Sequence, residues 1–139
     1  MQGKYKRILL KLSGEVLAGE EGKGLDFDIV TTVCKVVKEC ADMGTQIGIV
    51  VGGGNFWRGR SSGEMDRPRA DQMGMLATAI NSLALQDTLE QLGVKAQVLT
   101  ALSMPQVADV FTKRKAVEYL EGGQVVVIDE YMKSLREGK

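Results

Sequence analysis

The sequence predicts an α/β protein, a three-layer α/β/α sandwich in which a mainly parallel sheet lies between two layers of helices. Short apolar runs alternate with segments of helical periodicity, and glycines separate many of these segments. Strands that alternate with helices pair in parallel, and the helices cover both faces of the sheet. With 139 residues and a hydrophobic share of 44%, the chain is long and apolar enough to form the core of one domain.

Seven elements are expected, in the order strand, helix, strand, helix, strand, helix, strand. The strands are expected at residues 5–12, 46–51, 94–99 and 124–128, and the helices at residues 28–43, 68–92 and 112–121. The first strand is a near-continuous apolar run, which is typical of a strand buried on both faces. Asp26 or Asp28 would cap the first helix, and Gly44 would end it. Two helical stripes are expected in the core, Ile29, Val33, Val36, Val37 and Cys40 in the first helix and Met73, Met75, Leu76, Ile80, Leu83 and Leu85 in the second.

The composition excludes several classes of function. The chain has no histidine, so Ser-His-Asp and Cys-His catalytic systems and histidine-based zinc sites are ruled out. Its 18 basic and 18 acidic residues balance, which argues against a general nucleic-acid binder and against a polybasic membrane-surface protein. No segment has the pattern of a membrane span or a signal peptide, so we expect a cytoplasmic location, with Cys34 and Cys40 as reduced, buried small side chains. The remaining chemical groups, Lys, Arg, carboxylates, backbone amides and a metal ion, suit phosphoryl transfer.

The residues after the first two strands are the main candidates for a site, because parallel sheets bind ligands beyond the carboxyl ends of their strands. Lys11 ends the first strand, and Ser13 and Gly14 follow it. An ammonium group here can meet a phosphate that backbone amides approach closely at a glycine, although the lysine could also simply extend into solvent. Residues 52–54 are three glycines, which are not expected to serve packing because they contribute no side chain. They leave an open patch for an anion, or else form a flexible turn. They match neither a Walker A loop nor a dinucleotide fingerprint.

Two charged residues beyond the glycines extend the candidate site. Arg58 follows the glycine patch closely, and a guanidinium group there is expected to reach phosphate oxygens. The neighbouring Arg60, Arg67 and Arg69 are interpreted as solvated surface residues. Asp71 falls in the first turn of the long helix, where its carboxylate either stabilises the helix start or accepts hydrogen bonds from the hydroxyls of a sugar.

Three motifs, in this order, resemble those of bacterial-type uridylate (UMP) kinases of the amino-acid-kinase superfamily. They are Tyr-Lys-Arg-Ile-Leu-Leu-Lys-Leu-Ser-Gly-Glu at Tyr5–Glu15, Val-Gly-Gly-Gly-Asn-Phe-Trp-Arg-Gly at Val51–Gly59 and Ala-Asp-Gln-Met-Gly-Met-Leu-Ala-Thr at Ala70–Thr78. The third is the most specific to these kinases, whereas Lys-x-Ser-Gly and the triple glycine also occur in acetylglutamate kinase and aspartokinase. The resemblance runs from about Tyr5 to Ile128.

The resemblance implies phosphoryl transfer from ATP to UMP in pyrimidine nucleotide biosynthesis, with Mg²⁺ accompanying ATP. It implies catalytic roles for Lys11 and Arg58, ATP binding by Lys11, Leu12, Ser13, Gly14, Gly54 and Arg58, and UMP binding by Gly53 and Asp71. Lys11 would bridge the ATP phosphates, Arg58 would reach the transferring phosphate, and Asp71 would hold the ribose of UMP. No metal-ligating residue is assigned. Such kinases are hexamers activated by GTP, and the long helix would contribute to contacts between subunits.

The sequence departs from these kinases after Ile128. There the family's strand runs into a Gly-Gly-Thr-Gly-Asn-Pro-type loop that holds the acceptor, and a second half that holds adenine follows. Here Asp129–Lys139 is predicted to form a short helix, and it is similar to a later segment of full-length relatives. Residues 1–128 are therefore expected to be the N-terminal acceptor- and phosphate-binding part of a kinase domain, and residues 129–139 a displaced tail, with residues missing before and after that tail. Alone, such a chain would bind nucleotide phosphates with negligible turnover.

Two other functions remain open. The first keeps the fold and changes the acceptor to carbamate, acetylglutamate or aspartate, and the string around Asp71 argues against it. The second is a non-catalytic nucleotide- or oxyanion-binding protein on the same scaffold, like the molybdate and tungstate storage proteins. The presence of both Lys11 and Arg58 favours catalysis over that second function.

Overall fold

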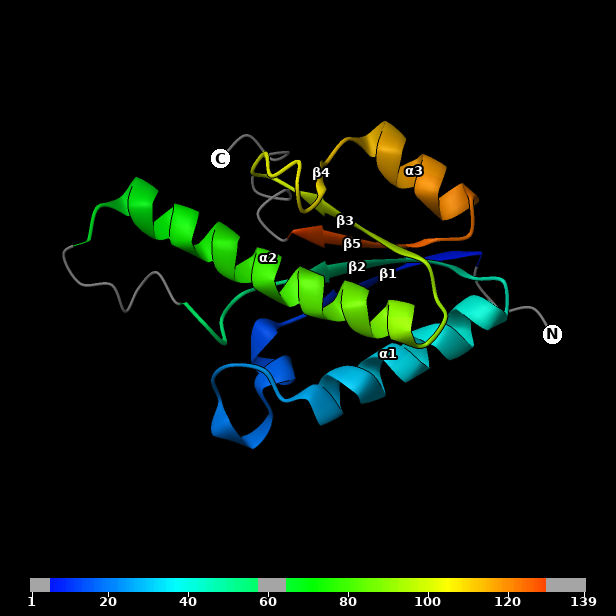
Figure 1. The fold of residues 1–139 in the computed structure, drawn as a ribbon, viewed down its shortest axis with the longest axis horizontal. Coiled ribbons are helices and arrows are strands. Elements are labelled where there is room, and N and C mark those ends of the chain that lie inside the picture. The colour runs from blue at the N-terminus through cyan, green and yellow to red at the C-terminus, as the bar shows by residue number, and fades with distance from the viewer. Residues whose placement is uncertain (1–5, 58–64, 130–139) are drawn as a thin grey trace.

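The computed structural model describes residues 6–57 and 65–129, and it has the predicted α/β architecture (Figure 1). One five-stranded sheet has the order β1-β2-β5-β3-β4, and each pair of neighbouring strands is parallel, as predicted. Its strands are β1 (Arg7–Leu12), β2 (Gln46–Val51), β3 (Ala96–Thr100), β4 (Asp109–Val110) and β5 (Val125–Asp129). The helices are the 3-10 helix η1 (Gly14–Glu21), α1 (Phe27–Asp42), α2 (Arg67–Gln91) and α3 (Lys113–Glu121).

Helices lie on both faces of the sheet (Figure 1). On the face covered by α1 and α2, the main core contains Val30, Cys34, Val37, Ile47, Ile49, Val51, Leu85, Leu89, Val98, Val125 and Val127. On the other face, α3 packs Ala116 and Leu120 against Leu99 and Val126. The central strand β5 is therefore buried on both faces, as a continuous run of β-branched residues in a parallel sheet predicts.

The first strand is not buried on both faces, contrary to the prediction. β1 lies at an edge of the sheet and alternates exposed with half-buried residues, and Leu9 is 67% exposed. Lys11 lies on the same face of β1 as Leu9, two residues further along. An apolar run cannot distinguish an edge strand from a central one, because the order of strands decides which neighbours cover it.

The predicted apolar stripe of α1 is displaced by about one residue. The buried residues are Val30, Cys34 and Val37, whereas Val36, which was expected in the core, is 55% exposed. The start of the helix was predicted correctly, because Asp26 Oδ1 accepts hydrogen bonds from the N–H groups of the second and third helical residues at 3.0 and 3.4 Å.

The long helix α2 packs a mostly small or polar face, rather than its bulky apolar stripe, against the sheet. The buried residues of this helix are Ala70, Gly74, Ala77, Thr78, Ala79, Asn81, Ser82, Leu85, Thr88 and Leu89. Of the predicted core residues, Leu85 is buried, but Met73, Leu76 and Ile80 are exposed. Two apolar faces compete in this sequence, and the face of small residues allows α2 to pass close to the glycine turn after β2.

Two short elements, η1 and β4, were not predicted, and β5 extends one residue beyond its expected end. Asp129 pairs in register with Val51 of β2 and is buried. The remainder of the expected helical tail, residues 130–139, lies outside the described residues. Within residues 6–57 and 65–129, no helix is both long and apolar enough to cross a bilayer.

Candidate functional site

The carboxyl ends of β1 and β2 share a cavity of about 440 Å³. The parallel register pairs Lys11 with Val50 and Leu12 with Val51, so both strands end at the same edge of the sheet. The residues that line the cavity are Lys11, Ser13, Gly14, Glu15, Gly52, Gly53 and Gly54. The fold thus gathers most of the predicted phosphate-binding residues at the place where parallel sheets bind ligands.

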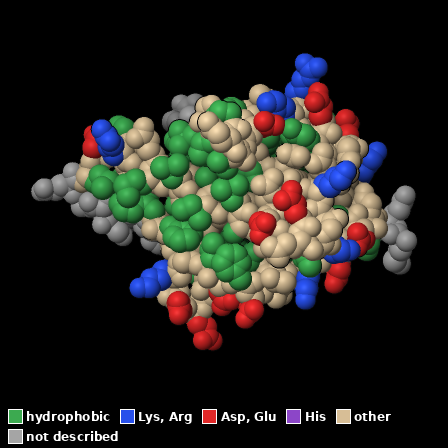
Figure 2. Space-filling view, in the orientation of Figure 1, with side chains coloured by type: hydrophobic (Ala, Val, Ile, Leu, Met, Phe, Trp, Pro, Cys, Tyr) green, Lys and Arg blue, Asp and Glu red, His purple; other side chains and the backbone are tan. Residues whose placement is uncertain are grey.

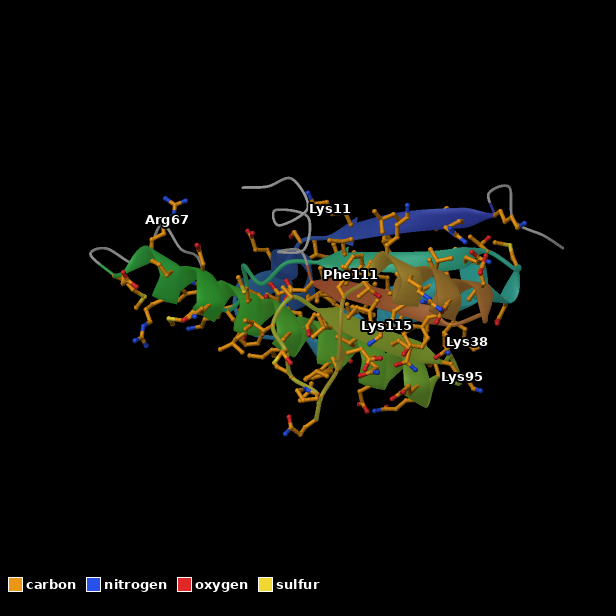
Figure 3. The ribbon with its side chains drawn as sticks, turned by 90° about the horizontal axis from the view of Figure 1, so that it is seen from above. Lys11, Lys38, Arg67, Lys95, Phe111 and Lys115 are labelled. Carbon is orange, nitrogen blue, oxygen red and sulfur yellow. The ribbon has the colours of Figure 1, made fainter. Side chains whose placement is uncertain are left out.

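Lys11 and Leu12 project to opposite faces of β1. Lys11 is exposed at the carboxyl end of the strand (Figure 3), where its ammonium group brings positive charge to the cavity. Leu12 packs against the main core, and its carbonyl oxygen accepts a hydrogen bond from the Gly52 N–H at 3.1 Å. Leu12 therefore holds the two strands together and does not line the cavity, although it was expected to bind ATP.

The glycines after β2 differ in what surrounds them. A Cβ atom on Gly53 would lie 2.8 Å from the Cβ of Ala77 and 2.9 Å from the backbone nitrogen of Thr78. A Cβ atom on Gly54 would lie 2.9 Å from a carboxylate oxygen of Glu15, at the end of a flexible side chain. The expectation that these glycines have no packing role is wrong for Gly53, because α2 leaves no space there for a side chain.

Three polar residues near the cavity were not singled out from the sequence. Glu15 lines the cavity directly, opposite Gly54. Asn55 and Asn81 are buried beside the glycine turn, and their side-chain amides are hydrogen-bonded to each other. Asn81 gave no usable signal, because it lies outside the apolar stripe that the sequence predicted as the buried face of the helix.

Arg58 and Asp71, the other two predicted ligand residues, directly follow two residues that are hydrogen-bonded to each other. Trp57 Nε1 donates a hydrogen bond to the carbonyl oxygen of Ala70 at 2.9 Å, which joins the end of the glycine turn to the start of α2. Asp71 comes next on α2, where it is exposed and does not line the cavity. Arg58 lies outside the described residues. Arg67 is exposed at the start of α2 (Figure 3), as its interpretation as a surface residue predicts.

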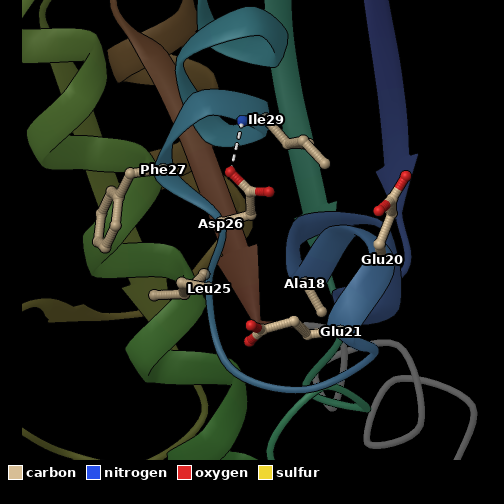
Figure 4. Close-up of a pocket in the computed structure, with 7 residues that line it drawn as sticks. All are labelled: Ala18, Glu20, Glu21, Leu25, Asp26, Phe27 and Ile29. Atoms are coloured by element: carbon tan, nitrogen blue, oxygen red, sulfur yellow. Dashed lines mark hydrogen bonds between the residues drawn. The ribbon is translucent and has the colours of Figure 1, made fainter.

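A second and larger hollow, of about 610 Å³, lies between η1 and the start of α1 (Figure 4). Among residues 6–57 and 65–129, its lining contains the carboxylates of Glu20, Glu21 and Asp26 and no basic side chain. Asp26 already caps α1. Such a lining repels phosphate, and the described residues contain no cluster of three or more His, Cys, Asp or Glu that could hold a metal ion. The cavity at Lys11 is therefore the better candidate for an anionic ligand.

Residues 6–139 match the amino acid kinase family. The chain belongs to this family. Its fold is similar to the crystal structure of UMP kinase from Ureaplasma parvum, with a TM-score of 0.82 and 33% identity over 90% of this chain and 54% of that one. The UMP kinase of Bacillus anthracis gives a TM-score of 0.83 and 35% identity, over 89% of this chain and 52% of that one. A substrate complex of isopentenyl phosphate kinase is 18% identical with a TM-score of 0.63, over 89% of this chain and 54% of that one, and shares the fold.

This member of the amino acid kinase family spans about half the length of the solved structures that it matches. In the part of that half that the structure describes, the cavity combines one lysine, one carboxylate and the backbone of four glycines. Backbone N–H groups at glycines and a nearby ammonium group attract phosphate oxygens.

Proposed function

We propose that this protein is a UMP kinase, which transfers the γ-phosphoryl group of ATP to UMP and yields ADP and UDP. The observation that carries the proposal is the shared cavity of Lys11 and the glycines at the ends of β1 and β2. It occurs in a chain that is 33% and 35% identical to two UMP kinases over about nine tenths of its length. A similarity of this size supports the same acceptor.

The residues of the cavity suit a reaction that depends on positioning and on neutralising charge. In the proposed reaction an oxygen of the UMP phosphate attacks the γ-phosphorus, and the bond from that phosphorus to the ADP oxygen breaks. Lys11 would bridge the phosphates of ATP, and the backbone of Gly53 and Gly54 would hold the acceptor and donor phosphates. Arg58 would reach the transferring group, and Asp71 would hold the ribose hydroxyls of UMP.

We propose that Mg²⁺ enters this site together with ATP. The donor set fits such an ion only in part, because Glu15 is the single carboxylate among the described residues that line the cavity, and Mg²⁺ prefers several oxygen ligands. Glu15 would therefore contribute one ligand, and phosphate oxygens would provide others. When bound, the ion would neutralise charge that develops on the phosphates.

We propose further that the protein forms a homo-oligomer, a hexamer, and that GTP regulates it. The exposed apolar side chains of α2, together with Met65 just before it, favour self-association. They are Met65, Met73, Leu76 and Ile80. Figure 2 shows hydrophobic side chains gathered on the face of the molecule that α2 occupies. A contiguous apolar patch of this kind is typical of an interaction surface.

The proposed function is tested by measuring ADP release in the presence of different acceptors. Intact mass is measured first, because a polypeptide near 15.1 kDa is expected to bind nucleotides with negligible turnover, whereas a larger one is expected to turn over. We expect UMP to give the fastest rate among UMP, carbamate, acetylglutamate, aspartate and isopentenyl phosphate. A faster rate with a non-nucleotide acceptor would contradict the UMP assignment, and nucleotide binding without turnover by a larger polypeptide would favour a non-catalytic role.

Matched lysine variants connect the activity to the cavity. Lys11→Ala removes the ammonium group that lines the cavity, whereas Lys35→Ala removes an exposed one on α1. Because hydrogen bonds to charged groups contribute about 1.5–3 kcal/mol, we expect Lys11→Ala to weaken ATP binding roughly 10- to 100-fold. Lys35→Ala should bind ATP like the unmodified protein.

A further inference from the structure

Two buried asparagines lie directly beside the glycine turn. Asn55 follows the turn and Asn81 lies on α2, and their exposed fractions are 3% and 0%. Asn81 Nδ2 donates to the Gly52 carbonyl oxygen and to Asn55 Oδ1, both at 2.7 Å. Asn55 Nδ2 donates to Asn81 Oδ1 at 3.1 Å and to the Gly24 carbonyl oxygen at 2.7 Å. Each side-chain amide therefore uses both of its N–H donors.

These hydrogen bonds fix the direction of one peptide group at the cavity. The Gly52 carbonyl and the Gly53 N–H belong to the same peptide bond, which is trans, so they point in opposite directions. Asn81 holds the carbonyl toward α2, and the Gly53 N–H is therefore directed away from Asn81. Within the described part of the chain, no group accepts a hydrogen bond from the N–H of Gly53 or Gly54. If the peptide group between Gly52 and Gly53 rotated by half a turn, its carbonyl oxygen would take the place of the N–H group and would repel a phosphate.

The asparagines also tie the turn to two other segments of the chain. The Gly24 N–H donates to the Asn55 carbonyl oxygen at 3.0 Å, beside the side-chain hydrogen bond in the other direction. From the side of β1, Gly14 approaches so closely that a Cβ atom would lie 2.5 Å from Asn55 Oδ1 and 2.7 Å from the Gly52 carbonyl oxygen. A rotation of either amide would leave buried polar groups without partners, so the arrangement resists change.

We propose that Asn81 and Asn55 are positioning residues that hold the peptide between Gly52 and Gly53 with its N–H group available to a nucleotide phosphate. The proposal rests on the phosphate site put forward above, and it identifies what fixes the shape of that site. Ser82 shows what a purely structural polar residue looks like at the same depth. It is also fully buried, but its hydroxyl donates to the Thr78 carbonyl oxygen within α2 and makes no hydrogen bond to the turn.

The test compares Asn81→Ala with the control Ser82→Ala in the intact chain. Tripolyphosphate, whose linked phosphates can occupy the adjoining donor and acceptor positions, is titrated into ¹⁵N-labelled protein while the amide resonances of Gly53 and Gly54 are followed. In the unmodified protein we expect both resonances to shift. We expect Asn81→Ala to bind about 5- to 10-fold more weakly and to show a smaller Gly53 shift, the loss corresponding to one or two neutral hydrogen bonds. Ser82→Ala should match the unmodified protein.

Circular dichroism establishes that each variant is folded. If Asn81→Ala does not fold, Asn55→Ala takes its place, because it removes the other side chain of the hydrogen-bonded Asn55–Asn81 pair. Equal affinity and equal Gly53 shifts in the asparagine variant and the unmodified protein would overturn the proposal. It would also be overturned by an unshifted Gly53 resonance in the unmodified protein, or by an equal loss in Ser82→Ala. If tripolyphosphate shifts Gly53 but UMP accepts no phosphoryl group, the proposed acceptor is wrong and the positioning role stands.

Discussion

Replacing Gly53 and Gly54 separately by alanine should distinguish packing from ligand approach at two adjacent positions. The Gly53→Ala methyl group would lie 2.8 Å from the Ala77 side chain and 2.9 Å from the Thr78 backbone, and α2 would have to move. Overpacking of this kind costs about 1–3 kcal/mol, while alanine recovers about 0.4–1 kcal/mol by restricting the unfolded chain. We therefore expect the free energy of unfolding to fall by roughly 0–2.6 kcal/mol, and by about 1.3 kcal/mol at the mid-points of the two ranges.

Gly54→Ala should change stability little and impair ligand binding instead. Its methyl group meets only the end of the flexible Glu15 side chain, so we expect stability within about 1 kcal/mol of the unmodified protein. The same methyl group enters the cavity and should weaken ATP binding. Urea unfolding followed by circular dichroism, with Trp57 fluorescence as a second probe, measures stability, and calorimetry measures ATP binding. A larger loss of stability in Gly54→Ala than in Gly53→Ala would refute this assignment of the two glycines.

Three further predictions concern the scaffold that positions the site. Burial raises the pKa of the Cys34 thiol from 9.0 to about 11, so the thiol favours folding below pH 9 and this contribution is lost as the pH rises to about 11. The stability difference between the unmodified protein and Cys34→Ala should shrink by roughly 2–3 kcal/mol over that range in urea unfolding, and a constant difference would contradict the account. Asp26→Ala should cost about 0.5–2 kcal/mol by removing the cap of α1, whereas Asp28→Ala should cost less; equal costs would argue against the cap. Tyr119→Phe should cost about 0.5–1.5 kcal/mol by removing the 2.7 Å hydrogen bond to Asp109, and a double-mutant cycle with Asp109→Asn should show coupling between the two side chains.

Most of the fold was predictable from the sequence because local patterns determine it. The strand at residues 46–51 has the predicted bounds, and the glycines and Asp26 mark the ends of helices. The edge position of β1 was not predictable in the same way, because it depends on the order of strands. The outward orientation of Leu76 and Ile80 was missed because α2 has two apolar faces and the sheet selects the one with smaller side chains.

The candidate site was predictable to the extent that strand ends determine it. Lys11 and Gly54 line the same cavity because parallel pairing brings the ends of β1 and β2 together. The packing of Gly53 against Ala77 joins residues that are far apart in the sequence, so no local pattern revealed it. The partnership of the glycine turn with Asn81 was hidden for the same reason.

The most direct test of the central claim is a calorimetric titration of the protein with ATP and Mg²⁺, and separately with UMP, in the unmodified chain, Lys11→Ala and Lys35→Ala. If the cavity at the ends of β1 and β2 holds the nucleotide phosphates, ATP affinity should fall roughly 10- to 100-fold in Lys11→Ala and stay unchanged in Lys35→Ala. UMP should also bind the unmodified protein. ATP binding that is indifferent to Lys11, or a protein that binds ATP but not UMP, would contradict the account.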